Sequence, residues 1–248
     1  MIRTILVVFS IFMFLVPGFP LLAAQNSLGK KDPGERDIES LHIIQRVFRF
    51  LLKLSGVKVT VRGQERIPRD TAVLYVGNHR SYFDILAGYT TVPGPVGFVA
   101  KKEMERIPLL RDWMVNVNCL FLDRHNIKEG LKTILEGIEK VKHGISIWIF
   151  PEGTRNENKD MTELLPFKEG SLKIAEKSGC PVVPVAITGT ADVLENHFPK
   201  IRPAHVTIVY GEPFYVKDLA PEDRKHVGAY TRERIREMLL EIQKETEK

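Results

Sequence analysis

Hydrophobic residues follow two different spacings along this 248-residue chain, and the spacing changes near Val57. The first segment, residues 4–24, carries no charge, and two prolines and a glycine interrupt it at positions 17–20. About 20 apolar residues cross a bilayer as a helix, but prolines and glycine break a helix before it has crossed. The segment is therefore compatible with a cleaved signal peptide, a spanning helix or a bent insertion that re-enters the membrane surface.

Residues 37–56 have the period of an amphipathic helix. Its apolar positions form one stripe: Leu41, Ile44, Val47, Phe48, Leu51 and Leu52. Its opposite face is polar and mostly charged: Glu39, His42, Arg46, Arg49 and Lys53. A basic face opposite Phe and Leu side chains is typical of a helix in the membrane interface; the alternative is a helix packed on the domain. We favour the interface, because the neighbouring apolar segment also needs a partner, and predict that residues 1–56 form a membrane-anchoring helical pair joined by a polar turn at 25–36.

From Val57 onward, strand-like runs alternate with helical patterns. The strand-like runs are 57–63, 72–77, 96–100, 119–123, 145–150, 182–187 and 205–211. The helical patterns are 83–90, 106–117, 126–142, 167–178 and 222–246. This alternation predicts an α/β domain over residues 57–248, with a mostly parallel or mixed sheet covered by helices. In the helix at 126–142, one stripe is expected to be buried: Ile127, Leu131, Ile134, Leu135, Ile138 and Val141.

The composition is that of a globular protein, with 44% hydrophobic and 27% charged residues. The formal net charge of +5 favours anionic partners such as phosphorylated metabolites or anionic membrane lipid. Nucleic acid is not expected as a partner, because the sequence has no long Lys/Arg block and no zinc or RNP-like motif. Cys119 and Cys180 lie in apolar runs without metal-ligand spacing, so we expect reduced core cysteines and no metal site.

Polar residues collect directly after the predicted strands, which is where α/β sheets build their sites. The stretch GNHRSYFD follows the strand at 72–77. Ser81 and Asp84 within it have the spacing of a capping box, and a helix that begins near Ser81 would return Asp84 toward His79. An imidazole oriented by a carboxylate is a general base suited to neutral pH. The structural alternative, a helix cap in a polar turn, is compatible with this catalytic interpretation.

The stretch FPEGTRN follows the strand at 145–150. Gly153 permits a tight backbone, and Arg155 offers a forked donor for phosphate or carboxylate. Taken alone, Thr154 and Glu157 are also a weak helix-capping signal. Further positive charge follows the neighbouring strands, at Lys101, Lys102 and Arg124. We expect these loops to converge on one edge of the sheet.

Five blocks of the sequence occur in an order that resembles a known family: NHRSYFD, FVAKKEMERIP, NCLFLDR, FPEGTRN and VVPVAI. The resemblance is to glycerolipid acyltransferases of the 1-acylglycerol-3-phosphate acyltransferase (PlsC-like) family and covers residues 57–215. The histidine-x4-aspartate block alone is a weak signal, but its combination with the FPEGTR block is specific. Asn118 departs from the pattern, because the family usually has glycine there.

The resemblance implies that the chain transfers a fatty acyl group from acyl-CoA or acyl-carrier protein to the sn-2 hydroxyl of lysophosphatidic acid, giving phosphatidic acid. His79 would take the proton from the acceptor hydroxyl, and Asp84 would orient the imidazole. The hydroxyl would attack the thioester directly, without a cofactor or an acyl-enzyme. Backbone N–H groups of the Glu152–Gly153 turn would stabilise the oxyanion.

The same resemblance assigns the substrate-binding residues, which are Lys101, Lys102, Arg124, Glu152, Gly153, Thr154 and Arg155. The lysines and arginines would hold the glycerol phosphate, and Glu152 would position Arg155 or the acceptor. Thioester donors are cytosolic, so the catalytic domain is expected on the cytoplasmic face of the cell (inner) membrane.

Three other functions remain open at this point. One is a related lipid acyltransferase that acts on glycerol 3-phosphate or another lysophospholipid. Another is a non-catalytic peripheral lipid-binding protein, which the His79 and Asp84 pair disfavours. The third is a hydrolase, for which the sequence has neither a nucleophile elbow nor a metal cluster.

Overall fold

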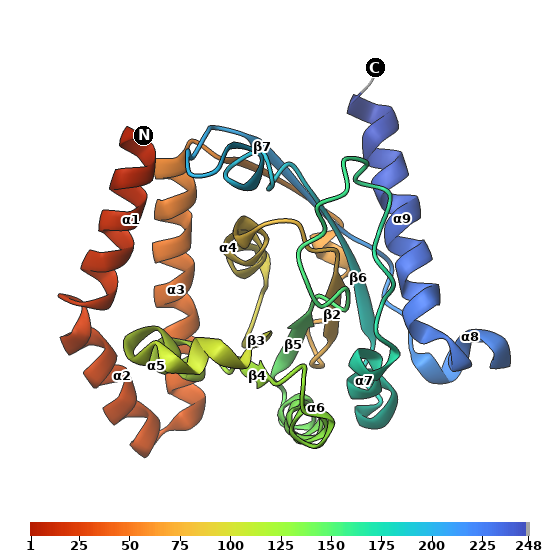
Figure 1. Cartoon of the computed structure of the whole chain (residues 1–248). Helices are drawn as coiled ribbons and strands as arrows, with labels where there is room; N and C mark the ends of the chain where they lie inside the picture. Colours follow the sequence, from red (N-terminus) through yellow and green to blue (C-terminus); the bar gives the residue numbers. More distant parts are fainter. Residues whose placement is uncertain (247–248) are drawn as a thin grey trace.

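A seven-stranded sheet forms the centre of the protein in a computed structural model, which describes residues 1–246 (Figure 1). The strands are β1 (Lys58–Arg62), β2 (Leu74–Gly77), β3 (Val96–Lys101), β4 (Leu120–Leu122), β5 (Ser146–Ile149), β6 (Val182–Thr188) and β7 (His205–Tyr210). Their order in the sheet is β1-β7-β6-β2-β5-β3-β4. Each strand predicted from the sequence is present, because short apolar runs between turn residues specify strands well here.

Most neighbouring strands are parallel, as predicted. The pairs β2–β5, β2–β6, β3–β4, β3–β5 and β1–β7 are parallel, and β6–β7 is antiparallel. The five strands β2 to β6 therefore run in one direction and end at the same edge of the sheet. The loops that follow them meet at this edge, which is where ligands bind in open α/β sheets.

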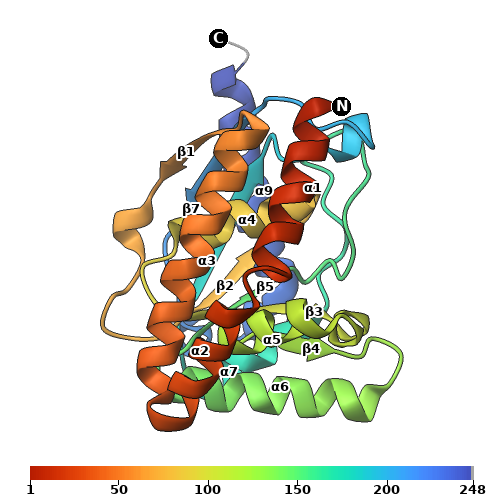
Figure 2. The same cartoon turned by 90° about the vertical axis from the view of Figure 1, so that its left-hand side faces the viewer.

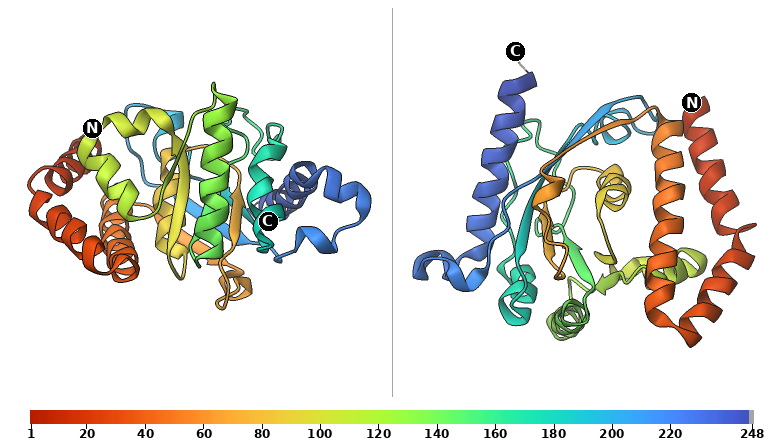
Figure 3. Two further views of the ribbon diagram at one scale, coloured as in Figure 1. Left: turned by 90° about the horizontal axis from the view of Figure 1, so that it is seen from below. Right: turned by 180° about the vertical axis from the view of Figure 1, so that it is seen from behind.

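Helices cover both faces of the sheet (Figures 1 and 3). The α-helices are α1 (Ile2–Leu15), α2 (Phe19–Lys31), α3 (Pro33–Ser55), α4 (Tyr82–Thr91), α5 (Pro108–Asn116), α6 (Ile127–Lys142), α7 (Lys173–Ser178), α8 (Pro221–Lys225) and α9 (Val227–Thr246). Short 3₁₀ helices are η1 (Gln64–Arg66), η2 (Lys102–Arg106), η3 (Glu169–Leu172), η4 (Glu195–His197) and η5 (Val216–Asp218). The predicted helix at 222–246 is divided into α8 and α9, and η3 forms the first turn of the one predicted at 167–178.

Alternate residues of the central strands point to two separate cores. Tyr75 of β2 and Trp148 of β5 pack with α1 to α5 in one core. Leu74 of β2 and Ile147 of β5 pack with α6, α7 and α9 in the other. The first core also contains Val7, so it extends without a break from the sheet to the first helix.

The N-terminal helices pack differently from the prediction. Residues 25–36 are not a polar turn: α2 continues to Lys31, and Asp32 caps α3 by accepting a hydrogen bond from the Glu35 amide at 2.9 Å. Helix α3 packs against α4, α2 and α1, and its apolar stripe belongs to the first core. Figure 2 shows α3 beside α1. The alternative of a helix packed on the domain therefore holds for α3. Apolar side chains are instead exposed on α1, where Ile5 is 62% and Phe9 57% exposed.

No helix among residues 1–246 is long and apolar enough to span a membrane by itself. Helices α1 and α2 meet the requirements of length and composition only as a pair, with a bend of 47° between them. Gly18 lies at this bend, where a side chain would collide with the carbonyl of Phe14.

The predicted buried stripe of α6 is wrong at Ile127, Leu131 and Leu135, which are 91%, 59% and 53% exposed. Ile138 and Val141 are buried as predicted, each 6% exposed. The inner face of α6 is instead formed around Gly137, where a Cβ atom would lie only 2.8 Å from Ile174 of α7. This close packing turns the N-terminal part of the apolar stripe toward the outside.

Candidate active site

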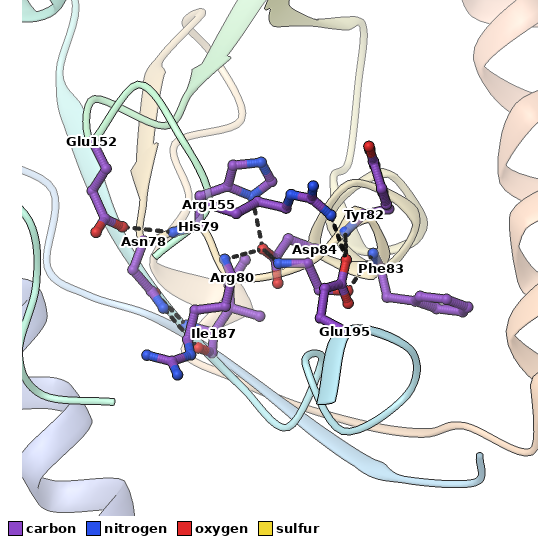
Figure 4. A network of polar contacts seen from close by, with 11 residues as sticks. Asn78, His79, Arg80, Tyr82, Phe83, Asp84, Glu152, Arg155, Ile187 and Glu195 are labelled. Atoms are coloured by element: carbon purple, nitrogen blue, oxygen red, sulfur yellow. Dashed lines mark hydrogen bonds and ion pairs between the residues drawn. The ribbon is translucent and has the colours of Figure 1, made fainter. Parts of the chain in front are cut away.

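The turn between β2 and α4 brings His79 and Asp84 together (Figure 4). Ser81 is the N-cap of α4: its Oγ accepts a hydrogen bond from the Phe83 amide at 3.0 Å. Asp84 Oδ2 accepts in return from the Ser81 amide at 2.8 Å, which completes the predicted capping box. The same oxygen lies 2.8 Å from Nδ1 of His79 and accepts from the Arg80 amide at 2.7 Å. The expected hydrogen bond between His79 and Asp84 is therefore confirmed, and it coexists with the helix cap.

Asp84 fixes the orientation and tautomer of the imidazole. Its side chain is 1% exposed, and an ionised carboxylate can only accept hydrogen bonds. Nδ1 of His79 therefore carries the proton, and Nε2 is left as the acceptor on the other side of the ring. The ring also stacks on Phe150, with centroids 4.3 Å apart and an interplanar angle of 13°.

Glu152 supports the turn from β5. Its Oε1 accepts from the amide of His79 at 2.8 Å, and its Oε2 accepts from the amide of Leu165 at 3.0 Å. The side chain is buried, and burial raises the pKa of the Glu152 carboxyl, although the two amide hydrogen bonds oppose this. Both carboxylate oxygens of Glu152 accept from backbone amides, and Arg155 is bonded to Glu195 instead. The role of Glu152 toward the acceptor stays a prediction.

Asn78 ties the same turn to β6. Its side-chain amide donates to the Ile187 carbonyl at 2.9 Å and accepts from the Ile187 amide at 2.8 Å. This pair of bonds continues the β2–β6 ladder one residue beyond Gly77, which pairs with Val185. The backbone at His79 is therefore held on one side by Glu152, in the loop after β5, and on the other by the bonds between Asn78 and Ile187 of β6.

Arg155 lies beside the N-terminus of α4. Its Nη1 donates to Oε1 of Glu195 at 3.1 Å, and its guanidinium carbon lies 4.2 Å from the ring centre of Tyr82. The amide of Tyr82 donates to the same Glu195 oxygen at 3.0 Å. These residues line a cavity of about 580 Å³ together with Arg80, Asn156, Glu157, Ala191, Leu194, Asn196 and Phe198.

The other predicted cations lie outside this cavity. Lys102 pairs with Asp123, with Nζ 3.3 Å from Oδ2, and Arg124 donates from Nη1 to the carbonyl of Gly153. Lys101 and Thr154 are exposed. The structure therefore brings Arg155 to the cavity, while Lys101 at the end of β3, Lys102 in η2 and Arg124 after β4 lie along the same sheet edge.

Gly153 has the conformation that the sequence suggested, with φ at 76°. Its amide donates to the carbonyl of Phe150 at 3.0 Å. The turn itself therefore uses the Gly153 donor, and stabilisation of an oxyanion by the amides of this turn stays a prediction. No helix follows Thr154, so the weak capping signal of Thr154 and Glu157 was also misleading.

Asn118, where the resemblance led us to expect glycine, has a backbone conformation that glycine adopts easily. It is 4% exposed and has φ at 60°, a left-handed conformation that asparagine tolerates better than most residues. Its Oδ1 accepts from Nζ of Lys140 at 3.0 Å. The position requires this backbone conformation and does not approach the cavity.

Cys119 follows Asn118 in the sequence. It is buried and free, and burial raises the pKa of its thiol.

Sequence reasoning missed Glu195 and the supporting role of Asn78. The signal for Glu195 was available, because the loop after the strand predicted at 182–187 belongs to the same sheet edge as the loops after the other parallel strands. Within residues 1–246 no group of three or more His, Cys, Asp or Glu side chains is arranged to hold a metal ion.

Comparison with known proteins places this geometry among lipid-synthesising enzymes. A family model described as Acyltransferase matches residues 58–188, which include every predicted site residue. The chain is 28% identical over 205 residues to the 1-acyl-sn-glycerol-3-phosphate acyltransferase of Saccharomyces cerevisiae, covering 82% of this chain and 66% of the yeast protein. It is 34% identical over 179 residues to the protein of the same name from Cocos nucifera, covering 72% of this chain and 56% of the coconut protein. It is 28% identical over 200 residues to the one from Escherichia coli, covering 80% of each.

A solved structure has the same fold. The crystal structure of the 1-acyl-sn-glycerophosphate (LPA) acyltransferase, PlsC, from Thermotoga maritima superposes with a TM-score of 0.82 and 28% identity. The similarity covers 98% of this chain and 95% of that one, so it includes the N-terminal helices. The matched part spans 66% of the yeast relative and 56% of the coconut relative.

Proposed function

This chain belongs to the acyltransferase family, and we propose that it transfers a fatty acyl group from a thioester to the sn-2 hydroxyl of 1-acylglycerol 3-phosphate, giving phosphatidic acid. The observation that carries the proposal is the hydrogen bond of 2.8 Å between His79 Nδ1 and Asp84 Oδ2. His79 directly precedes Arg80, which lines the cavity with Arg155. A general base next to a cationic cavity suits an acceptor that carries both a hydroxyl and a phosphate.

The proposed reaction uses the free nitrogen of His79. Nε2 takes the proton as the acceptor oxygen attacks the thioester carbonyl, and Asp84 stabilises the imidazolium that forms. The tetrahedral intermediate then expels the thiolate, and the imidazolium returns its proton to the sulfur. One ester bond forms and one thioester bond breaks, so the step needs no cofactor. The donor is acyl-CoA or acyl-carrier protein.

Arg155 is the residue that we propose as the main ligand of the acceptor phosphate. It lines the cavity and presents a planar donor fork that matches phosphate oxygens. Lys101, Lys102 and Arg124 are proposed as additional phosphate ligands, because they lie at or just after the ends of β3 and β4 at the same edge of the sheet.

The bent pair of α1 and α2 is proposed to insert into the cytoplasmic face of the cell membrane. The support is the exposed apolar surface of α1, combined with its position in the same core as the catalytic domain. A lysophospholipid can then reach the cavity from the lipid phase, while the thioester donor arrives from the cytosol.

The test is an acyl-transfer assay with lysophosphatidic acid and either acyl-CoA or acyl-carrier protein as donor. We expect His79→Ala to lower kcat by about 100- to 10,000-fold, which is the usual contribution of a general base. His143→Ala is the matched control, because His143 is an exposed histidine at the end of α6. Full transfer activity in His79→Ala would overturn the mechanism.

The acceptor specificity is tested in the same assay. A strong preference for glycerol 3-phosphate over lysophosphatidic acid would replace the proposed acceptor by that of a related acyltransferase. Lipid binding without any acyl transfer, from either donor, would identify a non-catalytic lipid-binding protein instead.

A further inference from the structure

We propose that Glu195 is an internal competitor of the acceptor phosphate: its carboxylate holds Arg155 and the N-terminus of α4 until a phosphate monoester displaces it. The inference rests on the proposed function, because it takes Arg155 as the ligand of a phosphorylated acceptor. Glu195 lies in η4, in the loop between β6 and β7, outside the residues 58–188 that match the family.

Two donors converge on one oxygen of Glu195. Oε1 accepts from Nη1 of Arg155 at 3.1 Å and from the backbone amide of Tyr82 at 3.0 Å. Tyr82 is the first residue of α4, whose N-terminus carries partial positive charge. A guanidinium and a helix N-terminal amide are also the donors that phosphate oxygens prefer. Glu195 therefore binds the groups that the phosphate would bind.

Withdrawal of Glu195 would leave the catalytic pair intact. The amides of Arg80 and Ser81 are bound by Asp84, and the amide of His79 is bound by Glu152. None of these bonds uses Glu195, which reaches the turn from a separate loop. The carboxylate can therefore leave the N-terminus of α4 without releasing His79 from Asp84.

The second oxygen of Glu195 favours the exchange. Oε2 is buried and accepts no hydrogen bond from the residues that the structure describes. Burial of an unpaired carboxylate oxygen costs free energy, so the ion pair with Arg155 is only partly compensated. A phosphate has three terminal oxygens and a larger charge, and binds the same donors more completely.

The negative charge of Glu195 distinguishes two roles for this residue: it is displaced from Arg155 by the phosphate, or it stays bound and orients Arg155. If Glu195 stayed on Arg155, its negative charge would repel a phosphate bound about 3 to 5 Å away. Removal of that charge would then tighten phosphate binding. If Glu195 mainly orients Arg155, the same removal would weaken it, so the two roles predict opposite signs.

The experiment compares Glu195→Gln with Glu233→Gln in the full chain. Glutamine keeps an oxygen for the Tyr82 amide, removes the charge and replaces the second oxygen by an amide NH2 group. Glu233 accepts from Nη1 of Arg236 at 2.8 Å on α9 and does not line the cavity, so Glu233→Gln is the matched control for loss of a carboxylate paired with arginine. We expect Glu195→Gln to lower the KM for lysophosphatidic acid and the Kd for inorganic phosphate by about three- to tenfold. We expect kcat of Glu195→Gln to stay within about twofold, and Glu233→Gln to change KM and Kd by less than about twofold.

A higher or unchanged Kd for inorganic phosphate in Glu195→Gln would overturn the proposal, as would an equal gain in Glu233→Gln. The pathway through Arg155 is tested in an Arg155→Gln background, where Glu195→Gln should give no gain. Phosphate binding is measured by calorimetry without a donor, so it is independent of the reaction. Tighter phosphate binding without acyl transfer would retain the role of Glu195 as competitor for an anion and reject the proposed function alone.

Discussion

Three carboxylates hold the turn that carries His79 by accepting hydrogen bonds from its backbone amides. Asp84, Glu152 and Glu195 together accept from the amides of all four residues from His79 to Tyr82. An ionised carboxylate has four lone-pair sites and no proton to donate, so it suits a turn with several unpaired amides. The turn thus depends on acidic residues from three segments: the first turn of α4, the loop after β5, and η4.

Burial of Glu152 has a separate effect, because it makes the stability of the fold change with pH. Burial raises the pKa of Glu152 in the folded protein above its unfolded value, so its contribution is fully present below the unfolded pKa and is lost as the pH rises through the folded pKa. Glu152→Gln does not titrate at this position. We expect the free energy of unfolding of the wild type, minus that of Glu152→Gln, to fall as the pH rises from about 4. Chemical denaturation at a series of pH values measures this difference, and a constant difference would contradict the shift.

The sequence predicted contacts between close residues better than contacts between distant ones. His79 and Asp84 are five positions apart, and the capping box alone was enough to place them together. Arg155 was identified by its motif, but its partner Glu195 lies 40 positions further on and in no motif. Which acceptor a side chain meets across two loops depends on the packing of the sheet edge, which residue type and spacing do not specify.

At the scale of elements, strand positions followed the sequence more closely than helix faces did. Strands such as β6 are buried on both sides, so a run of apolar residues is sufficient to recognise them. Which face of a helix is buried depends on how closely its backbone can pack against the neighbouring element, as well as on the hydrophobicity of its side chains. In α6, Gly137 has no side chain, so the helix backbone packs closely against Ile174 of α7. With this face turned inward, Leu131 lies on the outer face.

Two substitutions in α6 test this orientation. Ile138→Ala should lower the free energy of unfolding by about 2–5 kcal/mol, because the side chain is buried and its removal leaves a cavity. Leu131→Ala should change it by less than about 0.5 kcal/mol, because the side chain is mostly exposed. If denaturant titrations gave the same loss of unfolding free energy for both variants, Leu131 would be buried in solution and the assigned orientation of α6 would be contradicted.

At the scale of the whole molecule, the N-terminal helices and the catalytic domain are continuous. Val7 of α1 and Leu22 of α2 are buried in the same core as Tyr75 of β2. Thr4 also connects α1 to the loop that carries Glu195: its Oγ1 donates to the Pro199 carbonyl at 3.2 Å and accepts from the Ile201 amide at 3.0 Å. The proposed membrane segment therefore holds the domain in a defined orientation.

Membrane binding should depend on the outer side of α1. Phe9→Asp and Phe12→Asp place a charge at positions that are more than half exposed, so each should weaken partition into vesicles of phosphatidylcholine and phosphatidylglycerol by about tenfold or more. Thermal stability should change little. Leu135→Asp, which adds the same charge to an exposed position of α6, is the control for vesicle flotation. A loss of binding as large in the control would contradict the assignment to α1.

The bonds between Asn78 and Ile187 have a consequence for the order of folding. They join residues 109 positions apart, and the bond of the Tyr82 amide to Glu195 spans 113 positions. Closing such long loops costs entropy before the contacts form, so proteins with many distant pairings fold slowly. While β6 is still being synthesised, the nascent chain already contains His79 and Asp84, but not the strand that fixes the turn. We therefore expect the turn around His79 to reach its final conformation only when β6 has joined the sheet.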